Sequence, residues 1–292
     1  MLPLLPSLRW LDVQQSGEAV ILPHPSLFDF SNPFRSLERV SIKHLCAGYF
    51  EYLLATLQSA ASTGTLRLTH FKLSLYDEGS MLEEWILGLI DALAGAPLQS
   101  LALGSVRFTG VRVLNRIAET FPDLCALTLN YYVHFRTKEL AWPNSTLEYA
   151  KSLRGFNRLE YFAWNLHRRA VAYDTAPEVL SGMTPIAEGI ADEPENNART
   201  VSKVCATHCP TLKSIVFLDV ARGVDICCDV DALLRGSDDA VQRIRQENAP
   251  ANFGMYDPCW SSESSWPVFD KRLLLKPSIG RFKRPPFNLS RL

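Results

Sequence analysis

The feature that most constrains this chain is an apolar triplet that recurs seven times along it. In each triplet an apolar residue is followed three positions later by a second and two positions after that by a third. The triplets are Leu8/Leu11/Val13, Leu37/Val40/Ile42, Leu68/Phe71/Leu73, Leu98/Leu101/Leu103, Leu124/Leu127/Leu129, Leu159/Phe162/Trp164 and Leu212/Ile215/Phe217. Their first residues lie 29, 31, 30, 26, 35 and 53 positions apart. Such a period predicts a repeat array, in which each repeat needs its neighbours to bury its apolar face.

Each repeat has the pattern of a short strand followed by a helix. Leu127 and Leu129 alternate with Thr128, as in a strand with one buried face. Apolar residues at helical spacing, ended by glycine, proline or small polar residues, predict helices over 47–60, 80–94, 110–121 and 146–155. Ser80, with Glu83 three positions later, is expected to form a capping box at the start of the second helix.

Alternating strands and helices predict an α/β fold, a curved parallel sheet with an outer layer of helices. Stacking of the repeats would place the middle residue of every triplet in one internal column. That column is expected to contain Leu11, Val40, Phe71, Leu101, Leu127, Phe162 and Ile215.

The period is interrupted once and then lost. We expect residues 1–228 to form the repeat solenoid, with a surface insertion near 167–200, where prolines and polar residues accumulate. Residues 229–292 are expected to form a C-terminal part, with a helix over 229–247 and then an irregular capping tail. Asp229 or Asp231 is expected to cap that helix.

The composition argues against several classes of function. The net charge of −1 and the pI of about 6.6 do not favour binding to nucleic acid or to an anionic membrane. No run of about 18 apolar residues occurs, so no membrane span is expected. The seven scattered cysteines lack the density of a disulfide scaffold, which predicts reduced thiols and an intracellular location, in the cytoplasm or nucleus.

The candidate chemical motifs have ordinary structural explanations. Cys205, His208 and Cys209 lie close in sequence, but a structural zinc site needs four ligands, so we expect buried cysteines at a helix end. Asp225, Asp229 and Asp231 lack the glycine and the final glutamate of a calcium loop. The sequence has no Gly-x-Ser-x-Gly, dinucleotide-binding or phosphate-loop motif. We therefore predict no catalytic, cofactor-binding or metal-binding residues.

The last triplet resembles a known family. Cys209 and Pro210 precede Leu212, Ile215 and Phe217, and in the leucine-rich repeats of F-box proteins a helix ends in Cys-Pro-x-Leu-x-x-Leu-x-Leu. Residues 121–129 and 5–13 are variants of this line, and the irregular period is most similar to that of F-box proteins from mushroom-forming fungi. Over about residues 5–220, the resemblance implies a leucine-rich-repeat solenoid that recognises substrates for a ubiquitin ligase.

One departure from that family limits what the resemblance implies. A repeat begins within the first ten residues, so we expect the F-box itself to be absent from this chain. A ubiquitin-ligase adaptor is therefore expected as a partner only if an F-box exists upstream.

Residues that alternate with the apolar column are expected on the concave face, where a protein partner would bind. The expected partner-binding residues are Arg39, Lys43, His70, Lys72, Asn130, Tyr161 and Asn165. The basic residues among them favour an acidic or phosphorylated segment of the partner, and Tyr161 is a residue type enriched at interaction hot spots. The prediction is a protein-interaction module that is not an enzyme. Two alternatives remain open, a hydrolase-like enzyme with a dispersed site and a non-functional fragment of a longer protein.

Overall fold

The computed structural model describes residues 8–14, 34, 36–45, 47–62, 66–75, 81–106, 109–131, 143–164, 194–217 and 224–245. All of them belong to one compact unit, residues 1–258, whereas a second unit, 259–292, lies outside the described residues. Asn165, the region 165–193 and the expected capping tail after Arg245 also lie outside them.

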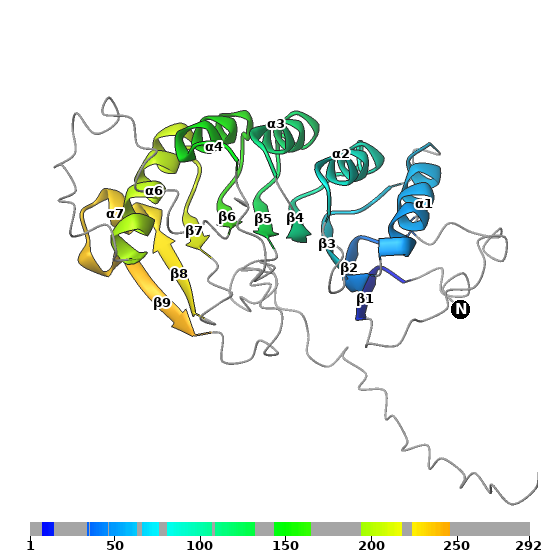
Figure 1. Cartoon of the computed structure of the whole chain (residues 1–292), viewed down its shortest axis with the longest axis horizontal. Coiled ribbons are helices and arrows are strands. Elements are labelled where there is room, and N and C mark those ends of the chain that lie inside the picture. The colour runs from blue at the N-terminus through cyan, green and yellow to red at the C-terminus, as the bar shows by residue number, and fades with distance from the viewer. Residues whose placement is uncertain are drawn as a thin grey trace, which may run out of the picture. The chain divides into compact units, whose positions relative to one another are not determined.

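The described residues form an α/β structure with one open, mostly parallel sheet (Figure 1). Its nine strands lie side by side in sequence order. Those with a parallel neighbour are β1 (Trp10–Gln14), β2 (Arg39–Leu45), β3 (His70–Leu75), β4 (Ser100–Val106), β5 (Ala126–Tyr131), β6 (Tyr161–Trp164) and β7 (Ser214–Phe217). Two antiparallel strands, β8 (Val224–Asp229) and β9 (Val241–Arg245), extend the sheet beyond β7.

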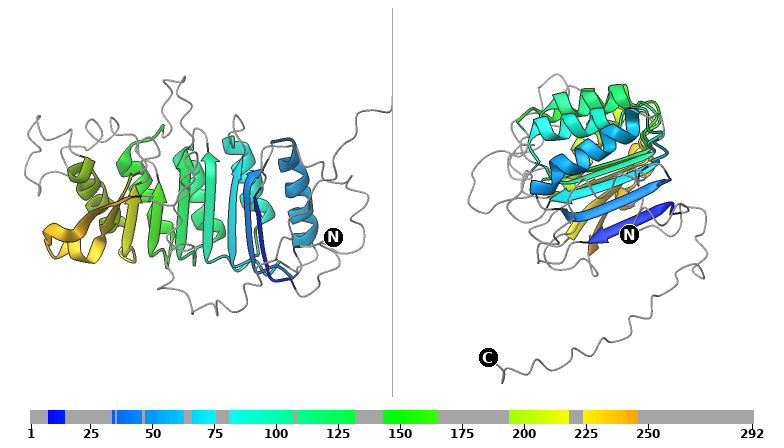
Figure 2. Two further views of the ribbon diagram at one scale, coloured as in Figure 1. Left: turned by 90° about the horizontal axis from the view of Figure 1, so that it is seen from below. Right: turned by 90° about the vertical axis from the view of Figure 1, so that its right-hand side faces the viewer.

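The helices cover one face of the sheet, as the end-on view of Figure 2 shows. They are α1 (Phe50–Ser62), α2 (Glu83–Ala92), α3 (Val111–Thr120), α4 (Thr146–Ser152), α6 (Pro194–His208) and α7 (Val230–Leu234). Short 3₁₀ turns precede α1 and follow α4. None of the helices in the described residues is long and apolar enough to span a membrane.

All seven predicted strands and the predicted apolar column are confirmed. The pairing register places Leu11 beside Val40, Val40 beside Phe71, and so on through Leu101, Leu127 and Phe162 to Ile215. From Val40 to Ile215 each column residue is at most 1% exposed. The third residues of the triplets, from Val13 to Phe217, form a second aligned column on the same face.

A backbone motif recurs at the start of each parallel strand. The carbonyl oxygen of Arg9 accepts hydrogen bonds from the N–H groups of Glu38 and Arg39, at 2.8 and 3.0 Å. Glu38, Thr69, Gln99, Cys125 and Glu160 repeat this arrangement, each accepting from two consecutive residues of the next repeat. One carbonyl therefore satisfies two donors at every junction from β1 to β7, which ties consecutive repeats in the same geometry.

The predicted helices are largely confirmed, with one correction at α2. That helix begins at Glu83 with Leu82 as its N-cap, and no side chain caps it, so the expected capping box of Ser80 and Glu83 is wrong. The capping box lies at α4 instead, where Ser145 Oγ accepts from Glu148 N and the Glu148 carboxylate accepts from Ser145 N.

The carboxylate of Glu83 has a different role, because it helps to hold the start of α3. Gly110, the N-cap of α3, donates its N–H to Glu83 Oε2 at 3.3 Å, and Val111 donates to Asn144 Oδ1 at 3.0 Å. A Cβ on Gly110 would lie 3.3 Å from both oxygens, so the close approach favours glycine. Side chains from both neighbouring repeats thus satisfy the first donors of α3.

The region after β6 corrects two boundaries. Residues 194–200 belong to α6 rather than to the expected insertion near 167–200. The helix predicted over 229–247 ends at Leu234, and β9 follows, so Val241 and Ile244 lie in a strand. Strand β8 contains both residues 228 and 229, so the sheet has no break at the expected boundary between the solenoid and the C-terminal part. Asp229 is the N-cap of α7, because its Oδ1 accepts from Ala232 N at 2.8 Å, and this decides between the two expected caps.

We expect Leu101→Ala to lower the free energy of unfolding by about 2–5 kcal/mol, because Leu101 is 1% exposed in the middle of the column. Leu234→Ala removes the same atoms from a side chain that is 62% exposed, and should change stability by less than about 0.5 kcal/mol. Urea unfolding followed by circular dichroism measures both. Equal losses in the two variants would contradict the assigned core.

The cap assignment predicts a second pair of unequal effects. Asp229→Ala should destabilise the protein by about 0.5–2 kcal/mol, since it removes the acceptor for Ala232 N. Asp231 lies inside the first turn of α7, so Asp231→Ala should lower the free energy of unfolding by less. The same unfolding measurement tests the pair, and a greater loss for Asp231→Ala would show that the cap is misassigned.

Candidate functional site

The face of the sheet that the helices leave uncovered contains six of the seven predicted partner-binding residues, and the seventh, Asn165, lies outside the described residues. Because strand residues alternate between faces, the residues beside the apolar columns point to this helix-free face. The register aligns one row of Trp10, Arg39, His70, Ser100, Ala126, Tyr161 and Ser214. A second row contains Asp12, Ser41, Lys72, Ala102, Thr128, Ala163 and Val216. The predicted alternation is therefore confirmed strand by strand.

Four of the predicted residues form a basic cluster on two adjacent strands, Arg39 and Lys43 on β2 and His70 and Lys72 on β3. Arg39 pairs in register with His70. The cluster is less open than the expected groove, because His70 is only 3% and Lys72 only 6% exposed. Arg39 and Lys43 are half-buried, and Lys43 Nζ lies 3.6 Å from Asp12 Oδ2 on β1. Arg39 and Lys43 are thus the more accessible cations of the cluster.

Hydrogen bonds link His70 to the preceding repeat through Thr69. Thr69 Oγ1 lies 3.0 Å from the carbonyl oxygen of Glu38 and 2.8 Å from His70 Nδ1. The hydroxyl has one proton, so it donates to only one of these two acceptors, and the tautomer of neutral His70 follows from that choice. Burial, and to a smaller extent the neighbouring Arg39 guanidinium, together lower the pKa of His70 to about 4. His70 is therefore neutral at pH 7.

The middle of the helix-free face is lined by small residues. Ser100, Ala102, Gly104, Ala126 and Thr128 lie there on β4 and β5, and all of them are buried. Solvent therefore does not reach this part of the face, although its side chains are short.

Two other predicted residues lie on β5 and β6. Asn130 is 8% exposed and Tyr161 is half-buried. In the part of the chain that the structure describes, the side-chain oxygens Ser41 Oγ and Asn130 Oδ1 are buried without a hydrogen-bond partner. Buried polar atoms of this kind are uncommon, and each indicates a position where a further polar group would be stabilised.

Trp10 and Ser41 lie on this face as their alternation predicts, although neither is among the seven expected partner-binding residues. Trp10 lies beside Arg39 in the register and is 41% exposed, although tryptophan is usually well covered. Ser41 lies beside Lys72. Both alternate with column residues in the sequence, so the signal was present. Only the exposure of Trp10 and the unpartnered hydroxyl of Ser41 distinguish them from their neighbours.

The Cys205, His208 and Cys209 group has the predicted structural role. Both cysteines are at most 1% exposed at the end of α6. Cys209 Sγ lies 3.9 Å from the carbonyl oxygen of Leu159. Burial raises the pKa of Cys205 to about 12, so its thiol stays protonated. His208 Nδ1 instead accepts from Arg154 Nε at 2.9 Å. No group of three or more potential metal ligands occurs among the described residues.

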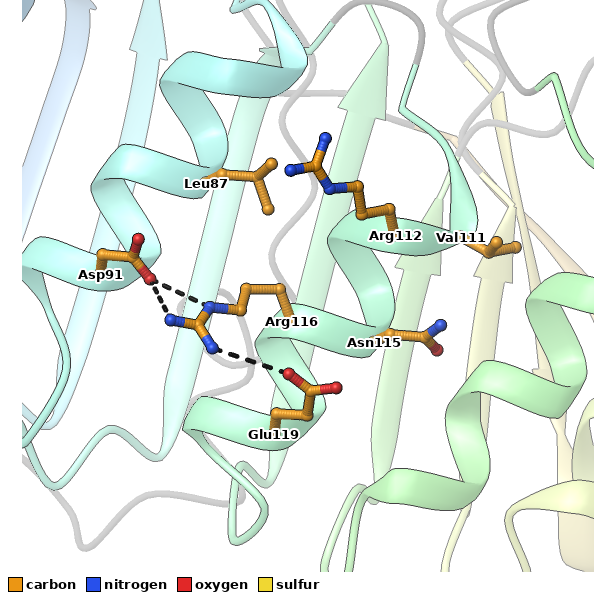
Figure 3. Close-up of a pocket in the computed structure, with 7 residues that line it drawn as sticks. All are labelled: Leu87, Asp91, Val111, Arg112, Asn115, Arg116 and Glu119. Carbon is orange, nitrogen blue, oxygen red and sulfur yellow. Dashed lines mark hydrogen bonds and ion pairs between the residues drawn. The ribbon is translucent and has the colours of Figure 1, made fainter.

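A groove of about 530 Å³ lies on the helix layer, between α2 and α3 (Figure 3). Arg116 of α3 donates to Asp91 Oδ1 of α2 through Nε and Nη2, at 3.0 and 2.7 Å, and its Nη1 lies 3.6 Å from Glu119 Oε2. Arg112 pairs with Glu83 at 3.6 Å. Each of these charged side chains thus has a partner on α2 or α3, and the Arg116–Asp91 and Arg112–Glu83 pairs link the two helices.

Comparison with known proteins adds no assignment to this geometry. No protein-family model matches the chain, and a search of the curated proteins finds no match.

The pKa of His70 predicts a loss of stability in acid. The unfolded chain binds a proton near pH 6.5, but the folded chain binds one only near pH 4. The contribution of His70 is therefore complete above pH 6.5 and is lost as the pH falls from 6.5 towards 4, by at most about 1.4 kcal/mol per pH unit. His70→Gln does not titrate and should show a flatter dependence over this range. Parallel curves for the two proteins, from urea unfolding at each pH, would contradict the assignment.

Proposed function

We propose that this chain is a leucine-rich-repeat solenoid that acts as a protein-interaction module. Its helix-free face would bind an acidic segment of a partner protein, phosphorylated or not. The observation that carries the proposal is the aligned sheet with two unlike faces. One face is a continuous apolar core under the helices, and the other presents the basic cluster beside small residues.

The repetition of one geometry supports the solenoid. The same column register and the same doubly accepting carbonyl occur at each of the six parallel junctions from β1 to β7. Contacts between neighbouring repeats that recur in sequence order are the defining property of a repeat solenoid. The resemblance of the Cys209–Phe217 line to the repeats of F-box proteins points to the same class.

The distribution of side chains supports binding. Arg39 and Lys43, which are both half-buried, supply positive charge at the accessible part of this face. Trp10 and Tyr161 flank this region on the same row, and arginine, tryptophan and tyrosine are the residue types most enriched at hot spots. The mechanism would be the positioning of a bound protein on a rigid surface, without chemistry of its own.

The resemblance extends this proposal to ubiquitin ligation. A substrate receptor binds its substrate through the repeats and binds the ligase through an F-box. The role proposed for this chain is the first of these, and contact with a ligase adaptor would need an F-box supplied from outside this sequence.

Charge reversal tests the proposed face. Arg39→Glu combined with Lys43→Glu should weaken binding of the acidic peptides selected from an acidic and phosphorylated peptide library by at least ~10-fold, about 1.4 kcal/mol. The matched control is Lys151→Glu with Arg235→Glu, which changes the net charge equally at exposed positions of the helical side. Fluorescence anisotropy measures the affinities, and circular dichroism verifies the fold. Equal weakening by both pairs, or none by either, would overturn the proposal.

A further inference from the structure

The helix-free face is buried more deeply than a bare sheet face. One residue on each strand from β2 to β7 is at most 6% exposed in its second row. These residues are Ser41, Lys72, Ala102, Thr128, Ala163 and Val216. The helices lie on the opposite face (Figure 2), and neighbouring strands cover only the flanks of a short side chain. Because Ala102 and Ala163 are 0% exposed, further atoms must lie above them.

The covered row ends in an apolar patch. Ala163 and Val216 form a small cluster of their own, apart from the main core, and Cys227 packs against it. This patch lies on β6, β7 and β8, next to the last strand β9. An apolar segment that enters the face from β9 would meet it first.

Lys72 indicates that the cover is acidic near β3. Its side chain is 6% exposed, and it is not an unpaired charge. Its register neighbours Ser41 and Ala102 are uncharged. Lysine is almost never buried this deeply without a partner, so a carboxylate above the sheet would account for its position.

Residues 246–258 have the composition that such a cover needs. They follow β9 directly and belong to the same compact unit as the sheet. They contain Phe253, Met255 and Tyr256, the acidic residues Glu247 and Asp257, and no basic residue. The segment is therefore apolar and negatively charged, which complements both the patch and the lysine.

The length of this segment matches the covered row. The sheet measures about 29 Å from β9 to β3, because neighbouring strands lie about 4.8 Å apart. Asp257 is 12 residues after Arg245, and 12 extended residues span up to about 40 Å. Asp257 can therefore reach Lys72 while the residues before it cross the apolar patch.

The position of the segment in the chain also favours it over other segments. Residues 132–142 join β5 to the start of α4, and residues 165–193 join β6 to α6, so each must return to the helix layer. Residues 246–258 follow the last strand that the structure describes, and no described helix requires them to return.

We infer that residues 246–258 bind across the helix-free face in the same chain, with their apolar side chains on the Ala163–Val216 patch and Asp257 near Lys72. One consequence rests on the proposed function. An acidic segment of a partner would have to displace residues 246–258, so the bound segment would lower the apparent affinity for the partner by the fraction of time that the face is free.

Photo-cross-linking of the full chain identifies the occupant. Tyr161 lies two residues before Ala163 on the same face and is half-buried. Tyr161→p-benzoylphenylalanine should cross-link to a peptide within 246–258 on irradiation, as mapped by mass spectrometry. The matched control, Tyr52→p-benzoylphenylalanine on α1, should not link to 246–258. Links from position 161 to 165–193, to a second copy, or only to neighbouring strands would overturn the inference.

Thiol labelling tests the cover without a new reactive group. Phe253→Ser with Tyr256→Ser should increase the iodoacetamide labelling rate of Cys227 by at least ~3-fold, since it weakens the cover over the patch. Cys205, 0% exposed in the core, should stay unlabelled and so verify the fold. If Cys205 is labelled too, Phe253→Ser alone replaces the pair. The comparison pair is Leu180→Ser with Met183→Ser, and a faster rate in that pair alone, or in neither, would contradict the assigned occupant.

The failure of this inference can be told apart from failure of the proposed function. The acidic peptides selected for the wild type should bind the Phe253→Ser, Tyr256→Ser chain about 10-fold more tightly if the face is free a tenth of the time. If position 161 links to 246–258 but no acidic peptide binds either chain, the segment covers the face and the proposed partner is wrong. If peptides bind both chains equally and the link lies elsewhere, the interaction face stands and the assigned occupant is wrong.

Discussion

The structure depends on contacts that cross from each repeat to the next. A single strand and helix of this chain cannot bury the triplet that defines it, and Phe71 lies between Val40 and Leu101 of the neighbouring strands in one core with the helices. At the same junctions one carbonyl oxygen accepts from two consecutive N–H groups of the following repeat. Apolar side-chain contacts and backbone hydrogen bonds therefore join the same pairs of consecutive repeats. A sheet built from such contacts extends in one direction.

This arrangement also sets the properties of the opposite face. Register errors are costly when one face is buried, because a shift of one residue would expose the whole column. A register fixed by the core therefore fixes the residues between the column positions as well. Arg39 and His70 are adjacent because Val40 and Phe71 are adjacent. The basic cluster is thus held by packing on the far side of the sheet, a rigid support that suits recognition.

Most of the repeat architecture could be predicted from the sequence, because its signal is local and periodic. The triplets, the stops at Gly95 and Pro122, and the short helix after Ser145 all appear in the structure where the pattern places them. One miss occurs where the period ends, and another occurs where a side chain is engaged by the next repeat. The spacing of Val241 and Ile244 is compatible with a helix or a strand. These residues form a strand because their backbone pairs with β8. Ser80 and Glu83 have the spacing of a capping box, but Glu83 is engaged by the start of α3, a contact that lies far along the chain.

The candidate site shows the same division. The sequence by itself determined which residues share the helix-free face, since alternation in a strand is a property of the backbone. Only the tertiary structure decided the exposed fraction of each of these side chains. His70 is only 3% exposed while Trp10 stays 41% exposed, although the two occupy equivalent positions in their repeats. Burial and the neutral state of His70 depend on groups brought together from different repeats, and no local pattern encodes that proximity.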